Sequence, residues 1–170
     1  VMVIARNNAA HLNLAEQFSA HTIKRTYIAL VSGSMELDEG VIDLPVGRHK
    51  KDFRRQAVSF VHSKNALTRY KVLKRFSSAT FLELIPETGR THQLRVHLAH
   101  LGHPILGDAK YGRKSDFTRL ALHARELGFL HPRNSKFVSF QSELPPVFNN
   151  FMIQESGRHK KCLHLKKSLL

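Results

Sequence analysis

The sequence predicts an α+β domain whose sheet is mixed and largely antiparallel and is flanked by a few helices. Three observations lead to this fold class. Short β-branched and aromatic segments recur along the chain, and most of them follow one another without an intervening helix. Only two or three segments carry the spacing of an amphipathic helix. The length of 170 residues corresponds to one domain, at a typical ~150 residues per domain.

The first half of the chain is predicted to alternate one helix with several strands. Residues 1–5 form an apolar run typical of a buried strand. Asn7 and Asn8 can cap a helix after it, whose apolar stripe includes Leu14 and Phe18. The next apolar or alternating segments are predicted as strands, at 26–31, 40–44, 57–61, 68–73 and 80–85.

Residues 91–101 carry the clearest helical spacing. The side chains on one face recur at positions i, i+3, i+4 and i+7, namely Leu94, His97, Leu98 and Leu101. Thr91 can cap the start, and Gly102 suits a left-handed residue at the end. Further elements are predicted downstream, as strands at 120–124 and 136–140 and as a loop with a short helix at 145–152.

Composition excludes several classes of protein. Hydrophobic residues make up 42% of the chain, enough to fill a core, so a mainly disordered chain is excluded. No run of about 18 apolar residues occurs, which excludes a transmembrane helix. Cys162 is the only cysteine, so a disulfide framework and a Cys-based zinc finger are excluded, and we expect a reducing, cytoplasmic setting.

The charge favours a polyanionic partner. Lys and Arg number 27 and Asp and Glu 13, which gives a net charge of +14. Nucleic acid is the first candidate and an anionic membrane the second, with a merely solubilising surface as the alternative. One basic cluster lies within 48–55 and another within 158–167. The first lacks helical periodicity and therefore fits a membrane-surface helix poorly.

Residues 88–98 read Thr-Gly-Arg-Thr-His-Gln-Leu-Arg-Val-His-Leu. Arg95 lies one residue off the apolar stripe, where an arginine either pairs with a carboxylate or phosphate or lies along the helix surface.

Four blocks of the chain, in the same order, resemble the RluA-type family of RNA pseudouridine synthases. They are 24–31, Gly47-Arg48-His49 after Pro45, 88–98, and 102–112 followed by 120–124 and His131-Pro132. The resemblance covers about residues 1–150.

The resemblance implies an isomerase that detaches uracil from its ribose, rotates it and rejoins it through carbon, with no metal and no cofactor. Tyr27 matches the family tyrosine that packs on the target base. Arg95 matches the arginine that pairs with the catalytic Asp, and Leu122 matches the apolar residue that closes the base pocket. The implied partner is structured RNA, ribosomal or transfer, with no membrane. The residues expected to contact RNA are Arg48, His49, Lys50, Lys51, Arg54, Arg55, Arg90 and His92.

The sequence departs from the family at the catalytic carboxylate. In the family this Asp lies in a His-Arg-Leu-Asp segment that precedes an apolar strand, and residues 1–5 match that strand. Asp108 lies in a Gly-Asp turn and is expected to form the turn rather than to act as a nucleophile. We therefore expect residues 1–152 to be the catalytic domain without its N-terminal strands and Asp segment, and residues 153–170 to be a basic tail.

Two consequences are expected from this departure. The chain alone should be inactive, and a non-catalytic RNA-binding fragment is the alternative function. A sheet edge and an apolar face should also be exposed, which favours association between chains.

Four histidines lie close together in the sequence, at positions 92, 97, 100 and 103. Two of them could share a helix face, which would suit a metal enzyme or a hydrolase. No carboxylate lies within the cluster, so we expect packing and hydrogen bonding to explain these side chains instead of a metal site.

Overall fold

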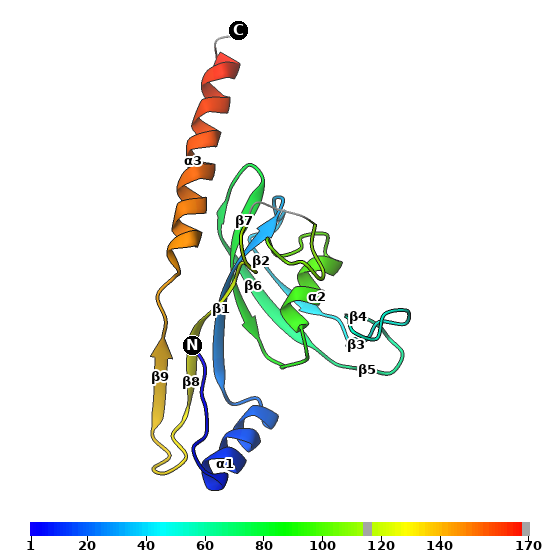
Figure 1. The fold of residues 1–170 in the computed structure, drawn as a ribbon, viewed down its shortest axis with the longest axis vertical. Helices are drawn as coiled ribbons and strands as arrows, with labels where there is room; N and C mark the ends of the chain where they lie inside the picture. The colour runs from blue at the N-terminus through cyan, green and yellow to red at the C-terminus, as the bar shows by residue number, and fades with distance from the viewer. Residues whose placement is uncertain (114–116, 168–170) are drawn as a thin grey trace.

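A six-stranded sheet forms the centre of the computed structural model, which describes residues 1–113 and 117–167, with side chains described as far as Gly157. Its strands are β1 (Lys24–Ser32), β2 (Glu39–Asp43), β6 (Leu67–Arg75), β7 (Ala79–Pro86), β8 (Leu122–Leu130) and β9 (Phe137–Gln141). They are arranged in the order β2-β6-β7-β1-β8-β9, and every neighbouring pair is antiparallel (Figure 1). The predicted fold class is confirmed.

A second, three-stranded sheet projects from one side of the first, and we call residues 46–64 the arm (Figure 1). Its strands are β3 (Val46–Arg48), β4 (Gln56–Val58) and β5 (Ser63–Lys64). β3 lies in the middle and is antiparallel to both neighbours. The basic cluster within 48–55 therefore begins at the end of β3, and its remaining residues connect β3 to β4. The strand predicted at 57–61 is shorter, because β4 ends at Val58 and residues 59–61 belong to the loop that leads to β5.

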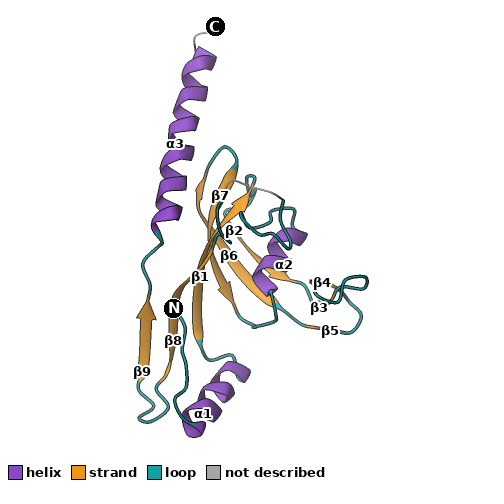
Figure 2. Cartoon of the chain, in the orientation of Figure 1, coloured by secondary structure: helices purple, strands orange, loops and turns teal. Residues whose placement is uncertain are grey.

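The described residues form three helices beside the sheets (Figure 2). They are α1 (Asn8–Ser19), α2 (Gln93–His100) and α3 (Pro146–Lys167). Leu94 and Leu98 of α2 are buried in the same core cluster as Ala29 of β1 and Leu82 and Leu84 of β7. Among the described residues, no helix is long and apolar enough to cross a membrane.

The N-terminal prediction is right for the helix and wrong for the strand. Asn7 caps α1 by accepting a hydrogen bond from the Ala10 backbone N–H at 2.9 Å. Residues 1–5 form no strand. Val1, Val3 and Ala5 are half-buried against a small apolar cluster under α1, while the residues between them point to solvent. The run is placed by this packing and not by a ladder of backbone hydrogen bonds.

Helix α2 is shorter than predicted, and Thr91 is not its cap. The N-cap is His92, which adopts a left-handed conformation with φ of 57° and makes no capping bond through its side chain. The side-chain oxygen of Gln93 accepts from the Arg90 N–H at 3.0 Å instead. Gly102 follows the helix with φ of 84°, the left-handed geometry expected there.

The C-terminal elements are longer than predicted. The strand expected at 120–124 begins at Leu122 and continues to Leu130. The short helix expected at 145–152 is the start of α3, which continues through the expected tail to Lys167. In this helix Glu155 is buried and accepts hydrogen bonds from Ser78 at 2.8 Å and Ser77 at 3.2 Å. The second basic cluster lies outside the residues whose side chains are described.

Candidate active site

Tyr27 lies where the pairing of β1 changes register. Thr26 is opposite Glu126 in β8, whereas Tyr27 is opposite Ala124, so Arg125 is an extra residue in β8. Such a bulge bends the strand and re-aims nearby side chains, and bulges are common beside active sites. On its other edge Tyr27 is opposite Leu84 of β7. The phenol ring therefore lies on the face of the sheet that α2 covers.

Gln93 fixes the turn that leads into α2. Its side-chain oxygen accepts from the Thr88 hydroxyl at 2.7 Å as well as from the Arg90 backbone. Its side-chain nitrogen donates to the carbonyl of Leu67 and the hydroxyl of Thr68, each at 3.0 Å. With both donors and both acceptor positions used, this buried amide holds the turn against β6.

A pocket of about 230 Å³ opens between β1, β8 and the start of α2. The three residues predicted to be catalytic, Tyr27, Arg95 and Leu122, all line it. Two residues predicted to bind RNA, Arg90 and His92, line it as well. The lining among the described residues contains no Asp or Glu. The described lining therefore offers one phenol ring, apolar surface and several cations, but no carboxylate.

Arg95 forms a two-pronged ion pair with Asp108. Its Nε donates to Oδ2 at 2.8 Å and its Nη2 donates to Oδ1 at 2.7 Å. Asp108 also accepts from the backbone N–H groups of Lys110 and Tyr111, at 2.9 and 3.0 Å. It is thus a turn former, and its side chain is fully buried.

The ion pair sets the charge of both partners. The hydrogen bonds that Arg95 donates to the Asp108 carboxylate raise the pKa of Arg95. Burial by itself would raise the pKa of Asp108, but the hydrogen bonds from Arg95 and from the two backbone N–H groups outweigh it and lower that pKa. Both groups are therefore ionised at neutral pH, and Arg95 is held in a fixed orientation at the pocket wall.

Tyr111 is a site residue that sequence reasoning missed. Its hydroxyl accepts from the Gln56 N–H of the arm at 2.9 Å and is hydrogen-bonded to His92 Nδ1 at 2.8 Å. The guanidinium carbons of Arg95 and Arg55 lie 4.9 and 5.2 Å from its ring centroid. Tyr111 therefore links the arm to the pocket. The only sequence signal was its place in a Tyr-Gly pair within a family-like block.

His92 is shifted towards its neutral form. Burial lowers its pKa, the positive charges of Arg95 and Lys110 lower it further, and the negative charge of Asp108 acts in the opposite direction. A neutral imidazole can accept the Tyr111 hydroxyl proton at Nδ1 and donate from Nε2.

Arg25 also lines the pocket and was not predicted as a site residue. Its Nη2 donates to the carbonyls of Pro86 and Glu87, at 3.1 and 3.3 Å. Its Nε is buried and has no hydrogen-bond partner among the described residues. Burial lowers the pKa of this guanidinium. A Cβ atom at Gly89 would come within 2.8 Å of Arg25 Nη1, so the absence of a side chain there makes room for the arginine.

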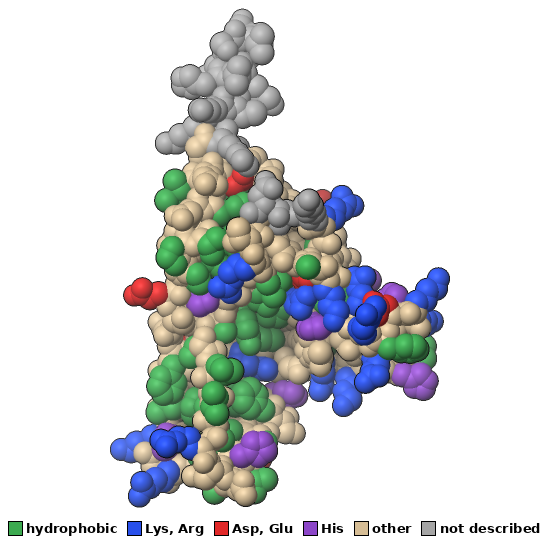
Figure 3. All heavy atoms as spheres, in the orientation of Figure 1, with side chains coloured by type: hydrophobic (Ala, Val, Ile, Leu, Met, Phe, Trp, Pro, Cys, Tyr) green, Lys and Arg blue, Asp and Glu red, His purple; other side chains and the backbone are tan. Residues whose placement is uncertain are grey.

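The residues predicted to bind RNA on the arm separate into two groups. Four of them are exposed, and these are Arg48, Lys50, Lys51 and Arg54. The other two are turned inward: His49 Nδ1 accepts from the backbone N–H groups of Lys51 and Asp52, and Arg55 lies over the Tyr111 ring. Figure 3 shows Lys, Arg and His side chains gathered on the arm and on the adjacent part of the body.

His97, one of the four clustered histidines, is a buried core residue. Its Nε2 is 2.9 Å from the Leu44 carbonyl and its Nδ1 is 3.0 Å from the Thr68 hydroxyl. Burial lowers its pKa. Both ring nitrogens therefore have partners inside the protein, which accounts for this side chain by hydrogen bonding.

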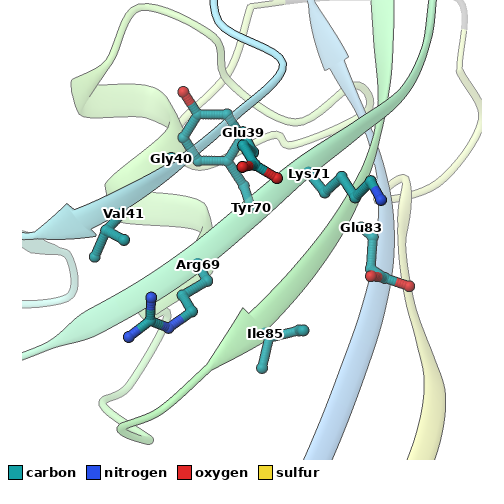
Figure 4. Close-up of a pocket in the computed structure, with 8 residues that line it drawn as sticks. All are labelled: Glu39, Gly40, Val41, Arg69, Tyr70, Lys71, Glu83 and Ile85. Atoms are coloured by element: carbon teal, nitrogen blue, oxygen red, sulfur yellow. The ribbon is translucent and has the colours of Figure 1, made fainter.

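A second hollow lies elsewhere on the sheet and contains none of the predicted site residues (Figure 4). It has a volume of about 320 Å³ and is formed by neighbouring residues of β2, β6 and β7. Its charged side chains are of both signs, Glu39 and Glu83 with Arg69 and Lys71. Tyr70 lies over Gly40, where a Cβ atom would come within 2.7 Å of the ring. This hollow is an uncovered part of the sheet, separate from the Tyr27 pocket.

Known proteins share both this sequence and this fold. The chain is 47% identical over 148 residues to the uncharacterized RNA pseudouridine synthase YlyB of Bacillus subtilis (strain 168), which covers 85% of the chain and 48% of that protein. It is 41% identical over 152 residues to the dual-specificity RNA pseudouridine synthase RluA of Pasteurella multocida (strain Pm70), which covers 87% and 68%. The solved structure of human RNA pseudouridylate synthase domain containing 1 superposes with a TM-score of 0.74 at 30% identity, over 83% of the chain and 62% of that structure.

The similarity covers only part of each relative's own length. The chain spans about half the length of curated relatives such as YlyB, at 48%, and the ribosomal large subunit pseudouridine synthase D of Nitrosomonas europaea, at 44%. The family model described as RNA pseudouridylate synthase matches residues 1–100. The resemblance predicted from the sequence is confirmed, and the chain belongs to the RNA pseudouridylate synthase family.

Proposed function

We propose that this chain supplies the uridine-binding wall of an enzyme that isomerises uridine to pseudouridine in RNA. The observation that carries the proposal is the single pocket lined by Tyr27, Arg95 and Leu122. These residues come from β1, α2 and β8, which are far apart in the sequence. A pocket with one aromatic ring, an apolar wall and a fixed cation suits a flat, uncharged base next to a reacting sugar.

Each of the three side chains has a role in this proposal. Tyr27 packs on the uracil ring, and Leu122 closes the pocket from the opposite strand. Arg95 has five N–H groups, of which Asp108 accepts two, leaving three for other acceptors. Those three can hold and orient a catalytic carboxylate and keep it ionised. Asp108 thus positions the arginine without occupying all of its donors.

The carboxylate itself has to come from another segment. None lines the pocket among the described residues. The backbone of Val1 lies next to the site, because its nitrogen donates to the Ala124 carbonyl at 2.8 Å, and Ala124 is opposite Tyr27. The family pattern implies a His-Arg-Leu-Asp segment and then Thr-Ser-Gly before the run that residues 1–5 match, so a preceding segment of this kind would bring its Asp within a few residues of the pocket. On this ground we propose that the 170-residue chain alone is inactive.

The substrate in this proposal is structured RNA, ribosomal or transfer, in the cytoplasm. The arm, which carries the exposed cations, is joined to the pocket region by the hydrogen bond from the Gln56 N–H to the Tyr111 hydroxyl. Phosphates held by the arm would thereby lie near the strand whose uridine enters the pocket. Phosphate contacts position the RNA and do not by themselves select one uridine.

The test compares two proteins on transcribed ribosomal and transfer RNA, with pseudouridine measured by mass spectrometry of the digested RNA. We expect no product from the 170-residue chain, and product from a longer chain in which a His-Arg-Leu-Asp segment precedes Val1. Tyr27→Ala and Arg95→Ala in the longer chain should each abolish product. Clear turnover by the 170-residue chain would overturn the role given to the preceding segment.

Binding of RNA without chemistry is the second candidate, because the pocket has no carboxylate while the arm is strongly basic. Under this alternative the longer chain also makes no pseudouridine, although both chains bind RNA with a strong dependence on salt. The same pair of proteins therefore distinguishes the two functions.

A further inference from the structure

Two phenylalanines on the arm are largely exposed to solvent, although an apolar ring is more stable when it is buried. Phe53 is 71% exposed in the loop between β3 and β4, and Phe60 is 79% exposed in the loop between β4 and β5. Within the described part of the chain, neither ring lies in an aromatic pair or under a cation. Val61 beside Phe60 is exposed too, at 58%. Apolar surface held in water on a projecting element indicates a binding site.

The backbone of the arm keeps these rings away from the core. The β4–β5 loop crosses β3 closely, since a Cβ atom at Gly47 would come within 3.0 Å of the His62 carbonyl oxygen. His62 itself is left-handed, with φ of 51°. The β3–β4 loop is held by His49 and Asp52, which accept backbone N–H groups within it. Both loops therefore have internal supports, and the phenylalanines are not needed to fill the arm.

The surroundings of the two rings determine what they fit. Lys50, Lys51 and Arg54 are exposed on the same loop as Phe53, and Arg48 is exposed at the end of β3. Lys64 is exposed on β5, four residues after Phe60. Asp52 is the only acid in residues 46–64, and it pairs with Arg54. Figure 3 shows apolar and basic surface next to each other on the arm. Cations interleaved with exposed aromatic rings are typical of surfaces that hold single-stranded nucleic acid, with phosphates on the cations and bases on the rings.

We infer that the arm binds an unpaired stretch of RNA, with bases stacked on Phe53 and Phe60 and phosphates on the neighbouring cations. The inference rests on the proposed RNA function and adds the form of RNA that is recognised next to the pocket. Unpaired bases are required because the faces of paired bases are covered by their neighbours in a duplex. Stacking tolerates any base, so the arm selects loops and single strands over helices without reading a sequence.

The test measures binding of the 170-residue chain to three probes of about ten nucleotides. Small domains that bind single strands, such as OB-folds, cover about 4–16 nucleotides. The probes are oligouridylate, the same ribose-phosphate chain without bases, and a duplex. Phe53→Ala and Phe60→Ala should each weaken oligouridylate binding by about 5- to 150-fold. Affinity for the abasic chain and the duplex should stay within about twofold. Phe53→Tyr and Phe60→Tyr should keep the affinity because they keep the ring.

Controls separate stacking from charge and from folding. Phe137→Ala removes an exposed ring on β9, outside the arm, and should leave all three affinities unchanged. Lys51→Gln should weaken binding of all three probes and lower the salt dependence of that binding. The phenylalanine variants should leave the salt dependence unchanged. Thermal melts of every variant establish that the fold is kept.

Three results would overturn the inference: equal losses on oligouridylate and duplex, no loss on oligouridylate, or no binding of any RNA by the chain. In the first two cases the proposed function stands, because pseudouridine formation by the longer chain is measured separately. In the second case, loss of binding to anionic lipid vesicles by Phe53→Ala and Phe60→Ala would identify a membrane as the ligand of the arm.

Discussion

The guanidinium of Arg95 and the carboxylate of Asp108 share two hydrogen bonds of 2.8 and 2.7 Å, with the Asp108 side chain fully buried and the Arg95 side chain 18% exposed. Arg95 is expected from the family to face a catalytic carboxylate, yet its Nε and Nη2 already face a structural one. The pair turns a flexible side chain into a fixed part of the pocket wall. Several properties of the protein should depend on this contact.

Asp108→Asn should destabilise the fold strongly. The change removes the charge opposite a mostly buried arginine, and breaking a buried pair by removing one partner costs about 3–5 kcal/mol. The free energy of unfolding in urea measures this cost. Asp38→Asn is the matched control, because Asp38 pairs with Arg75 at the surface and is 85% exposed, so its loss should cost less than about 1 kcal/mol. Equal effects of the two variants would contradict the importance assigned to Asp108.

The same carboxyl group makes the stability depend on pH. The folded-state pKa of Asp108 is lowered from its ordinary value of 3.8, so in acid the unfolded state binds a proton more readily than the folded state. Its contribution is therefore complete above about pH 5 and is lost as the pH falls below 3.8 through the lowered pKa. The difference in unfolding free energy between the wild type and Asp108→Asn should shrink over that window. A difference independent of pH down to acid unfolding would argue against the shift.

The pKa of His92 should respond in opposite directions to the loss of two of its charged neighbours, Lys110 and Asp108. Lys110 lowers this pKa and Asp108 raises it, in addition to the larger lowering by burial. Lys110→Gln should therefore raise the pKa, and Asp108→Asn should lower it further, provided that the fold is kept. Titration of the His92 ring signals by NMR measures both. Shifts in the same direction for both variants would contradict the arrangement.

The strands of the six-stranded sheet were predictable because their signal is local, whereas the short strands β3 and β5 of the arm were not predicted. Thr68, Tyr70 and Val72 alternate with more polar positions, and this period of two is enough to place β6. Residues 1–5 show the limit of that reasoning. Their side chains alternate between core and solvent as a strand would, but the backbone pairs only at Val1. Whether an apolar run joins a sheet depends on a neighbour with free hydrogen-bonding groups, and the sequence does not contain that information.

The site was predictable only as far as the resemblance reached. Tyr27, Arg95 and Leu122 were named from family motifs, and they line one pocket. The partners that fix them were not foreseen. Asp108 and Tyr111 meet α2 because the chain folds back after Gly107, whose φ of 67° allows the turn, and contacts of this kind are set by tertiary structure. Arg25 was missed because a basic residue near the end of a strand is usually a solvent-exposed surface residue.

Tyr111→Phe should loosen the arm while leaving the core intact. The variant keeps the ring between Arg55 and Arg95 and removes the hydroxyl, which accepts the Gln56 N–H and is also hydrogen-bonded to His92 Nδ1. Loss of one such hydrogen bond costs about 1 kcal/mol. Hydrogen exchange should therefore become faster at Gln56 and in β4, with no change at the buried residues of β7. Tyr70→Phe is the control, because this tyrosine lies in the main sheet. Unchanged exchange in the arm would show that Tyr111 does not connect it to α2.

The edge formed by β9 should promote association between chains. β9 is the last strand of the sheet, and Phe137 and Phe140 are both more than half exposed on it. An apolar edge strand with unpaired backbone groups can pair with another copy of itself. Sedimentation velocity should show a dimer whose fraction grows with concentration, and Phe137→Lys should reduce it because a charge on the edge strand opposes pairing with another chain. Leu12→Lys changes an equally exposed residue on α1 and should have no effect. A monomer at every concentration would show that the twist of β9 or its neighbouring charges already protect this edge.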